Sequence, residues 1–235
     1  MFYHSFLNQQ YTHIHYNYKQ TNLLVGIRPF LDDQQSVFKI IDTQVRRIYA
    51  YLELLIKKHP PFRTSLSPIQ MHSKIPYINN MLKYSKQAGV GPMATVAGMF
   101  SDEIVKQLSP LYESVFCENG GDTAIHNAEG ANVLVCDGPD GFDTKIVLEL
   151  PPGKHALASS GRSGHSLSLG QADLVTVCSS NAIKSDAFAT AIANKVRVGK
   201  DNNELLQQFS FLDAVLIIAH GKLWYKGKYE IDFLK

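Results

Sequence analysis

Residues 111–122 read LYESVFCENGGD, and within this stretch the spacing of apolar residues changes from helical to strand-like. Upstream, apolar residues recur every three or four positions, which predicts helical segments at 33–58 and 77–108. Downstream, alternating and short continuous apolar runs predict strands at 112–118, 122–127, 131–136, 144–150, 155–159 and 173–178. Because helices gather early and strands late, the order favours an α+β fold, with a mostly antiparallel β-sheet packed with helices.

The remaining segments extend this pattern to both ends of the chain. Residues 3–28 look extended, and 185–196 and 203–209 have helical spacing. Residues 214–219 form a buried-strand pattern, and 223–233 suggest a final hairpin around Lys226-Gly227-Lys228. No stretch has the composition of a linker, so we expect residues 1–235 to form a single domain whose helical segments pack on the β core.

Composition narrows the class of protein. The chain has 235 residues, 45% of them hydrophobic and 19% charged, which is ordinary for a globular protein. A net charge of +2 gives no reason to expect nucleic acid as a partner. Three widely spaced cysteines, Cys117, Cys136 and Cys178, argue for a reducing compartment. No apolar run is long enough to span a membrane and no signal peptide is recognisable, so we expect a cytoplasmic protein.

The run Ser185-Asp186-Ala187-Phe188-Ala189-Thr190 is the strongest candidate for a metal site. If it opens a helix, Asp186 and Thr190 lie four residues apart on one face, near the end where anions are favoured. A carboxylate and a hydroxyl so placed suit Mg²⁺, which shares its oxygen ligands with water and phosphate. The alternative is local: aspartate is favoured in a first helical turn, and Thr190 can bond a carbonyl one turn back.

Asn119-Gly120-Gly121-Asp122 lies between two predicted strands. It is typical of a tight hairpin turn, because asparagine, glycine and aspartate tolerate positive φ. The same residues would also let a ligand approach the backbone closely, since glycine has no Cβ. Both interpretations stay open at this point.

A second glycine-containing loop combines hydroxyls with a cation. Its residues are Ser159, Ser160, Gly161, Arg162, Ser163, Gly164 and His165. Backbone N–H groups in such turns can bind an anion, and Arg162 could hold a phosphate with two hydrogen bonds. His165 is the candidate for a catalytic group that moves a proton, because histidine titrates near neutrality. The alternative is an exposed loop stabilised by serine turns.

Cys117 adjoins the first glycine turn. Strand alternation makes it either a buried core residue or a thiol that faces the site. A free cysteine is more often an inert core residue, but a sulfur- or redox-handling function remains an alternative.

The order of these motifs resembles the ApbE superfamily, the flavin transferases that attach FMN to proteins. A Gly-Gly turn, a Ser-Gly turn, an apolar strand and the Asp186–Thr190 run follow one another in the same order. The chain is more similar still to the UPF0280 (DUF375) branch of that superfamily. Residues 20 to 220 carry its motifs GPMATVAG (91–98), ENGGD (118–122) and GHSLSLGQAD (164–173).

The resemblance implies an ApbE-like fold and a Mg²⁺-dependent transfer. In these enzymes a threonine hydroxyl of a target protein attacks the FAD pyrophosphate, FMN is transferred and AMP leaves. Mg²⁺ would be held by Asp186, Thr190 and the carbonyl of Ser185. FAD or FMN, or another nucleotide diphosphate, would then contact a set of cofactor-binding residues from the two turns, namely Asn119, Gly120, Gly121, Asp122, Ser160, Gly161 and Arg162.

One departure from the transferases keeps an alternative open. Their His-x-x-Asp-Pro stretch is replaced here by His165-Ser166-Leu167-Ser168-Leu169-Gly170. The sequence therefore also fits a non-catalytic ligand-binding or assembly protein that kept the cradle for metal and phosphate. A symmetric homodimer is expected from the apolar strands late in the chain.

Overall fold

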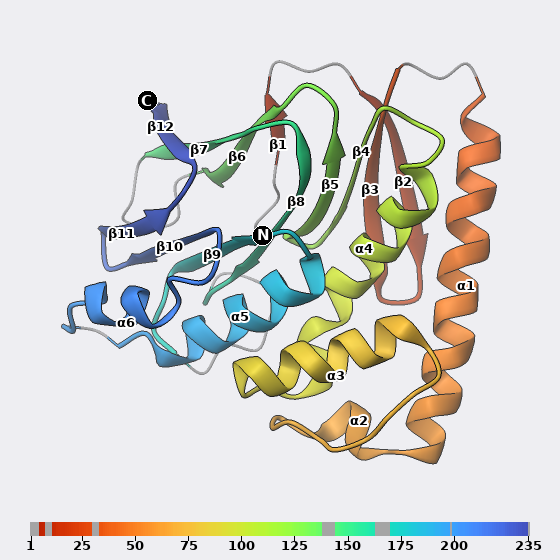
Figure 1. Cartoon of the computed structure of the whole chain (residues 1–235), viewed down its shortest axis with the longest axis horizontal. Coiled ribbons are helices and arrows are strands. Elements are labelled where there is room, and N and C mark those ends of the chain that lie inside the picture. The colour runs from red at the N-terminus through yellow and green to blue at the C-terminus, as the bar shows by residue number, and fades with distance from the viewer. Residues whose placement is uncertain are drawn as a thin grey trace.

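The computed structural model describes residues 5–7, 11–29, 33–137, 144–162, 170–197 and 199–234. Along the described part of the chain, three strands are followed by a helical stretch, six strands, two more helices and three final strands (Figure 1). The helices are α1 (Gln34–Lys58), α2 (Pro61–Thr64), α3 (Pro76–Ala88), the 3-10 helix η1 (Pro92–Thr95), α4 (Val96–Leu108), α5 (Ala182–Lys195) and α6 (Asn203–Gln208).

The predicted helical segments are confirmed, and their ends have clear local causes. Asp33 caps α1 by accepting hydrogen bonds from the backbone amides of Gln35 and Ser36. α3 begins with a proline and ends at Gly89, whose φ of 75° is left-handed. The short helix α2 escaped prediction because four residues carry too little periodicity.

Two antiparallel sheets contain the strands. The larger has the order β11-β10-β9-β8-β5-β4-β3-β2 and the smaller the order β1-β6-β7-β12. The bounds are β1 (Ser5–Leu7), β2 (Thr12–Tyr18), β3 (Thr21–Arg28), β4 (Ser114–Asn119), β5 (Asp122–Asn127), β6 (Ala131–Asp137), β7 (Lys145–Leu150), β8 (Gly153–Ser160), β9 (Leu174–Ser179), β10 (Ala214–Ala219), β11 (Lys222–Gly227) and β12 (Glu230–Leu234). Every pairing is antiparallel, as the α+β interpretation requires.

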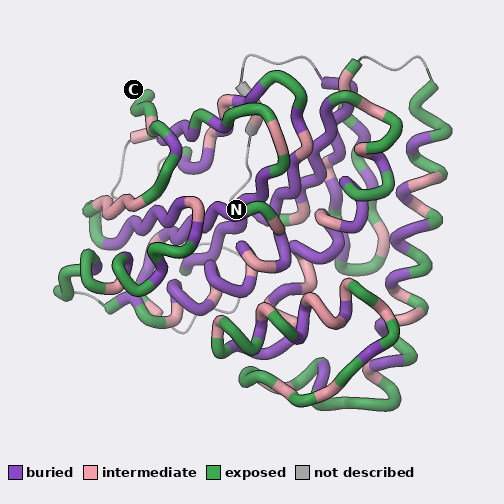
Figure 2. Tube along the Cα trace, in the orientation of Figure 1, coloured by how far each residue is buried: buried purple, intermediate pink, exposed green. Residues whose placement is uncertain are grey.

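The central strands of the large sheet are buried on both faces, which is why they are apolar without clean alternation (Figure 2). Val25, Cys117 and Ala156 belong to the apolar cluster that α1 and α4 share. Phe116 and Leu157, one position away on β4 and β8, join the cluster that the small sheet shares. Helices therefore cover one face and the small sheet the other.

The predicted final hairpin is wrong. β11 pairs with β10, whereas β12 pairs with β7 in the other sheet. Gly227 is not a turn residue, because a Cβ there would lie 2.4 Å from the Cβ of Ala214 on the neighbouring strand. Lys228 and Tyr229 instead anchor the crossover: the Lys228 amide donates to the Asp213 carbonyl, and the Tyr229 hydroxyl lies 3.0 Å from Nδ1 of His155.

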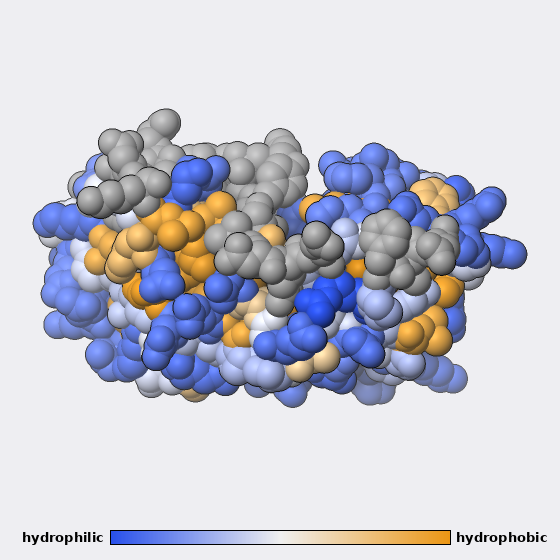
Figure 3. Space-filling view, turned by 90° about the horizontal axis from the view of Figure 1, so that it is seen from above, coloured by the Kyte–Doolittle hydropathy of each residue, from blue (hydrophilic) through white to orange (hydrophobic). Residues whose placement is uncertain are grey.

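Apolar side chains also reach the surface. Apolar residues gather on the surface at the end of the molecule where the small sheet lies (Figure 3). In that sheet, Phe233 and Leu234 of β12 are large apolar residues with exposed side chains. Among the described residues, no helix combines the length and apolarity that crossing a bilayer requires.

Candidate functional site

Two carboxylates meet where the β4–β5 hairpin approaches the first turns of α4 and α5 (Figure 1). Asp122 is the first residue of β5 and is 8% exposed. It pairs in register with Ala158 of β8, which packs under α5, so the Asp122 side chain shares the helix-covered face of the sheet. Asp186 comes to the same place from the second turn of α5.

The Gly-Gly turn is a two-residue hairpin. Asn119 pairs with Asp122 across it, and Gly120 and Gly121 have φ values of 66° and 104°. The Gly121 amide donates a 2.6 Å hydrogen bond to Oε1 of Glu118, which is itself buried. The hairpin interpretation explains both glycines, and contact of a ligand with this turn stays a prediction.

Two neighbouring carboxyl groups repel the charge of Asp122. Burial, then Asp186, then Glu118 raise the pKa of Asp122 well above its ordinary value. Burial also raises the pKa of Glu118 to about 7, although the amides of Gly121 and Gly120 oppose it. Among the described residues, no donor bonds the Asp122 carboxylate, so its negative charge is uncompensated.

Asp186 is held differently, although burial raises its pKa too. Its Oδ2 accepts a 3.0 Å hydrogen bond from the Gly98 amide, and the Ala97 amide also stabilises the charged form. These are the second and third residues of α4, so Asp186 caps that helix from a neighbouring one. Asp186 therefore does interact with a helix N-terminus, but with that of α4, 88 residues away, and not with that of its own helix as the local alternative required.

The predicted start of the helix at 185 is wrong. α5 begins at Ala182 after the N-cap Asn181, whose Oδ1 accepts from the Lys184 amide. Asp186 is thus in the second turn rather than the first. The end of α5 that favours anions is already occupied, because Asp102 accepts from the amides of Ala182 and Ile183.

The other two predicted metal ligands flank Asp186 on α5. Ser185 is fully buried, and its hydroxyl contacts Oγ of Ser179 at 2.8 Å and donates to the Ala156 carbonyl. That hydroxyl therefore anchors α5 to the sheet, and only its carbonyl was predicted as a ligand. Thr190 follows Asp186 by one turn and is half-buried.

The second loop is placed only in part. Ser160 ends β8 and is buried, and Gly161 packs so closely that a Cβ would lie 2.2 Å from the Asp173 carbonyl. Arg162 donates from Nη2 to Oδ1 of Asp173 at 2.7 Å, with half of its side chain exposed. Residues 163–169 lie outside the described part of the chain, so the catalytic role of His165 stays a prediction.

Cys117 lies on the helix-covered face and has no exposed surface. Burial, and then the charge of Glu118, raise the pKa of its thiol. A buried, protonated thiol is a poor nucleophile, which favours the core interpretation. Cys136 and Cys178 are also buried and free.

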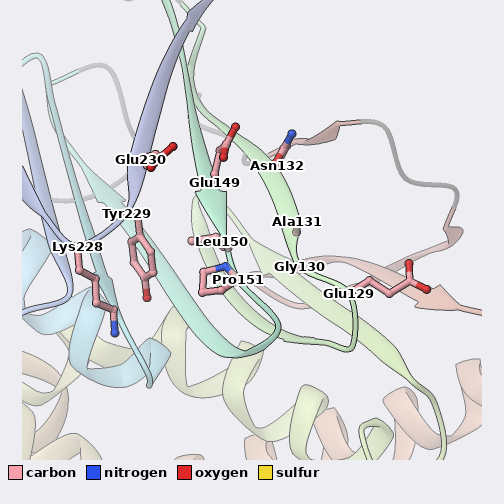
Figure 4. Close-up of a pocket in the computed structure, with 10 residues that line it drawn as sticks. All are labelled: Glu129, Gly130, Ala131, Asn132, Glu149, Leu150, Pro151, Lys228, Tyr229 and Glu230. Carbon is pink, nitrogen blue, oxygen red and sulfur yellow. The ribbon is translucent and has the colours of Figure 1, made fainter.

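Two further observations bear on ligand binding. A cavity of about 710 Å³ is lined by residues of β6, β7 and β12 in the small sheet and of the segments next to them, and none of the predicted site residues lines it (Figure 4). Its walls are Glu129, Gly130, Ala131, Asn132, Glu149, Leu150, Pro151, Lys228, Tyr229 and Glu230. The described residues contain no group of three or more His, Cys, Asp or Glu side chains arranged to hold a metal ion.

Sequence reasoning missed Asp102 and the structural role of Gly98. Gly98 is part of the 91–98 motif, and a Cβ there would lie 2.3 Å from the Ala182 carbonyl. Its glycine was a usable signal, because glycine within an apolar helical pattern often marks a close contact. Asp102 offered no signal, since its partners are 80 residues away.

Comparison with known proteins gives the family. A family model described as "AbpE bacteria" matches residues 4–220. A UPF0280 protein of Methanococcus maripaludis is 34% identical over 212 residues, which cover 85% of this chain and 84% of the relative. A UPF0280 protein of Methanocaldococcus jannaschii is 29% identical over 223 residues, covering 89% and 88%.

Solved structures give the fold. The ApbE protein of Thermotoga maritima matches with a TM-score of 0.59 at 15% identity, covering 94% of this chain and 96% of that one. Flavin Transferase ApbE from Vibrio cholerae matches with a TM-score of 0.57 at 11% identity, covering 94% and 97%. The chain therefore belongs to the UPF0280 family of ApbE-like proteins and has the fold of the ApbE flavin transferases.

Proposed function

We propose that this protein binds Mg²⁺ together with FAD, FMN or another nucleotide diphosphate at the junction of Asp122 and Asp186, and that it catalyses phosphoryl or FMN transfer there. The observation that carries the proposal is the pair of carboxylates itself: both have raised pKa values, and no cation among the described residues compensates Asp122. Two solved proteins with this fold are named flavin or flavinyl transferases, which supports a flavin as the ligand.

The residues present fit a magnesium ion. The Asp186 carboxylate keeps free lone pairs after accepting from the helix amides, because a carboxylate has about four. Asp122, Thr190 and the Ser185 carbonyl would complete the protein's share, and water and phosphate oxygens would supply the rest. When bound, the cation neutralises charge on a diphosphate.

Residues of the chain itself would position the carboxylates, orient the phosphate and transfer the proton. The paired strands β4, β5 and β8 hold Asp122 at a fixed place under α5. Arg162 would orient a phosphate if it exchanged Asp173 for the ligand. We propose His165 as the group that takes or delivers the proton of the transfer.

Calorimetric titration tests the proposal, with FAD and ADP added with and without Mg²⁺. We expect affinity for at least one of the two to rise at least tenfold with Mg²⁺, and expect Asp186→Asn to abolish the rise. Asp42→Asn on α1 is the control, because Asp42 pairs with Arg46 far from the site in sequence and should leave binding unchanged. Equal affinity in wild type with and without Mg²⁺ would remove the metal from the proposal.

A second function, ligand binding without transfer, is favoured by one observation. The phosphate donors predicted from sequence already face carboxylates: Arg162 pairs with Asp173, and the Gly121 amide bonds Glu118. Incubation with FAD, Mg²⁺ and a threonine-containing acceptor protein separates the two functions. Release of AMP with an FMN mass increase on the acceptor indicates transfer, whereas tight binding without either product indicates a binding protein.

A further inference from the structure

α4 and α5 cap each other. Near their N-termini the helices run antiparallel, and each gives an aspartate to the free amides of the other. Asp186 of α5 accepts from Gly98 of α4 at 3.0 Å. Asp102 of α4 accepts from Ala182 through Oδ1 at 3.0 Å and from Ile183 through Oδ2 at 3.1 Å.

The close approach of the two backbones depends on Gly98. A Cβ at this position would lie 2.3 Å from the Ala182 carbonyl and 3.0 Å from Cβ of Asp186. Gly98 donates to Asp186, and Ala182 donates to Asp102. Because Gly98 and Ala182 are in contact, the two caps are coupled.

The acceptors of the first backbone amides of α5 show which residues fix the position of this helix. Asp102 takes the amides of the first two residues, and Asn181 takes that of Lys184. Asp102 is the only one of these acceptors that comes from a different element. Rotation or sliding of α5 along its axis would break both of its hydrogen bonds.

We infer that Asp102 is a positioning residue for the cation site, an inference that rests on the proposed function. Asp186 follows Ala182 by about one helical turn, so the place of Ala182 fixes the place of Asp186. Without the Asp102 carboxylate, α5 loses two of its hydrogen bonds to α4 and keeps the one from Gly98 to Asp186, so Asp186 and Thr190 shift relative to Asp122 on the sheet. Asp102 touches neither the cation nor the ligand.

Cation affinity is the first test, measured by electron paramagnetic resonance with Mn²⁺ as the probe. We expect Asp102→Asn to weaken Mn²⁺ binding by about tenfold to a hundredfold, as loss of an orienting residue does at other metal sites. Asp33→Asn is the matched control, because Asp33 caps α1, away from the site. Wild-type affinity in Asp102→Asn would overturn the inference.

Amide exchange measured by nuclear magnetic resonance tests positioning without the cation. If Asp102 positions Asp186, Asp102→Asn should speed exchange at least tenfold at Gly98, which donates to Asp186, as well as at Ala182 and Ile183. A purely local cap would change Ala182 and Ile183 alone, and that result would overturn the inference. If wild type binds no Mn²⁺, the proposed function fails, and exchange at Gly98 still decides the role of Asp102.

Discussion

Asp122 and Asp186 are the same kind of residue in opposite situations. Asp186 receives hydrogen bonds from the amides at the start of α4, which favour its charged form. Asp122 has burial and two neighbouring acids against it. If Asp122 binds a cation as we propose, its buried charge destabilises the folded protein until the cation is bound.

This difference predicts opposite effects of one substitution on stability and on binding. Asp122→Asn removes a repelled buried charge, so we expect the metal-free protein to gain on the order of 1 kcal/mol, or about 2–4 °C in Tm. We expect the same variant to lose Mg²⁺-dependent ligand binding. Calorimetric unfolding in EDTA, paired with titration of the ligand, measures both; a variant that is less stable and still binds contradicts the prediction.

The Gly-Gly turn supports a second residue-scale prediction. Gly121 has a φ of 104°, which a side chain adopts only with strain, so Gly121→Ala should destabilise the protein by about 1 kcal/mol or more. If a ligand lies against the turn, binding should also be lost. Gly120→Ala is the comparison: its φ of 66° also strains a side chain, but a Cβ there meets nothing within 4 Å. Equal binding by both variants and wild type would leave the turn a hairpin only.

Cys117 supports a third prediction. Its thiol is buried, and burial raises its pKa, so a small alkylating agent should label it slowly at neutral pH. Mass spectrometry of labelled peptides checks this, with Cys136 and Cys178 as internal references. Rapid labelling that a nucleotide suppresses would instead support the sulfur-handling alternative.

At the scale of elements, local patterns predicted most of the fold. Strands 122–127 and 214–219 and the helix from 33 to 58 come within a residue of their predicted ends, because turn residues, caps and periodicity coincide there. The final hairpin failed because its partner strands are chosen by tertiary contacts: Tyr229 is anchored on His155, which is 74 residues away. The start of α5 was missed although Asn181 is a good N-cap residue.

The contact between α4 and α5 supports a prediction at this scale. In an exposed helix, Gly→Ala stabilises by about 0.5–1 kcal/mol. At Gly98 the added Cβ would lie 2.3 Å from the Ala182 carbonyl, so we expect Gly98→Ala to destabilise instead, by on the order of 1–3 kcal/mol. Urea unfolding measures the sign. Gln107→Ala on the exposed face of α4 is the control and should change stability little.

At the scale of the whole molecule, the site exists because three layers meet. Helices on one face of the large sheet bring Asp186 to Asp122, while the small sheet packs against the opposite face of β4 and β5. Sequence motifs single out Asp186 and Thr190 as candidate metal ligands and Asp122 as a candidate cofactor-binding residue, and these roles stay predictions. Sequence could not predict the repulsion between Asp122 and Asp186 or the cap from Asp102, because both depend on packing between segments 60 or more residues apart along the numbered chain.

Four buried or half-buried carboxyl groups together predict how stability changes with pH. In the folded state the pKa of Glu118 is about 7 and that of Asp102 about 6, against ordinary values of 4.5 and 3.8, and those of Asp122 and Asp186 are raised as well. Between the ordinary and the raised pKa the folded state holds more protons than the unfolded state. Stability from these groups is therefore complete at low pH and is lost as pH rises towards 7, at about 1.4 kcal/mol per pH unit for each excess proton.

His155 and His13 oppose this trend, because burial lowers the pKa of each and their contribution to stability is lost as pH falls through the lowered value. Four carboxyl groups outnumber these two histidines, so we expect the metal-free protein to unfold at a higher temperature at pH 5.5 than at pH 7.5. Millimolar Mg²⁺ should raise Tm chiefly at pH 7.5, because the cation compensates the charged Asp122 and Asp186. Scanning calorimetry in EDTA and in Mg²⁺ measures both the pH dependence of Tm and the rise in Tm with Mg²⁺. Asp122→Asn should reduce both effects. A Tm that falls from pH 7.5 to 5.5 in EDTA would mean that the carboxyl groups are compensated within the protein, and the cation would then lose its physical reason to bind.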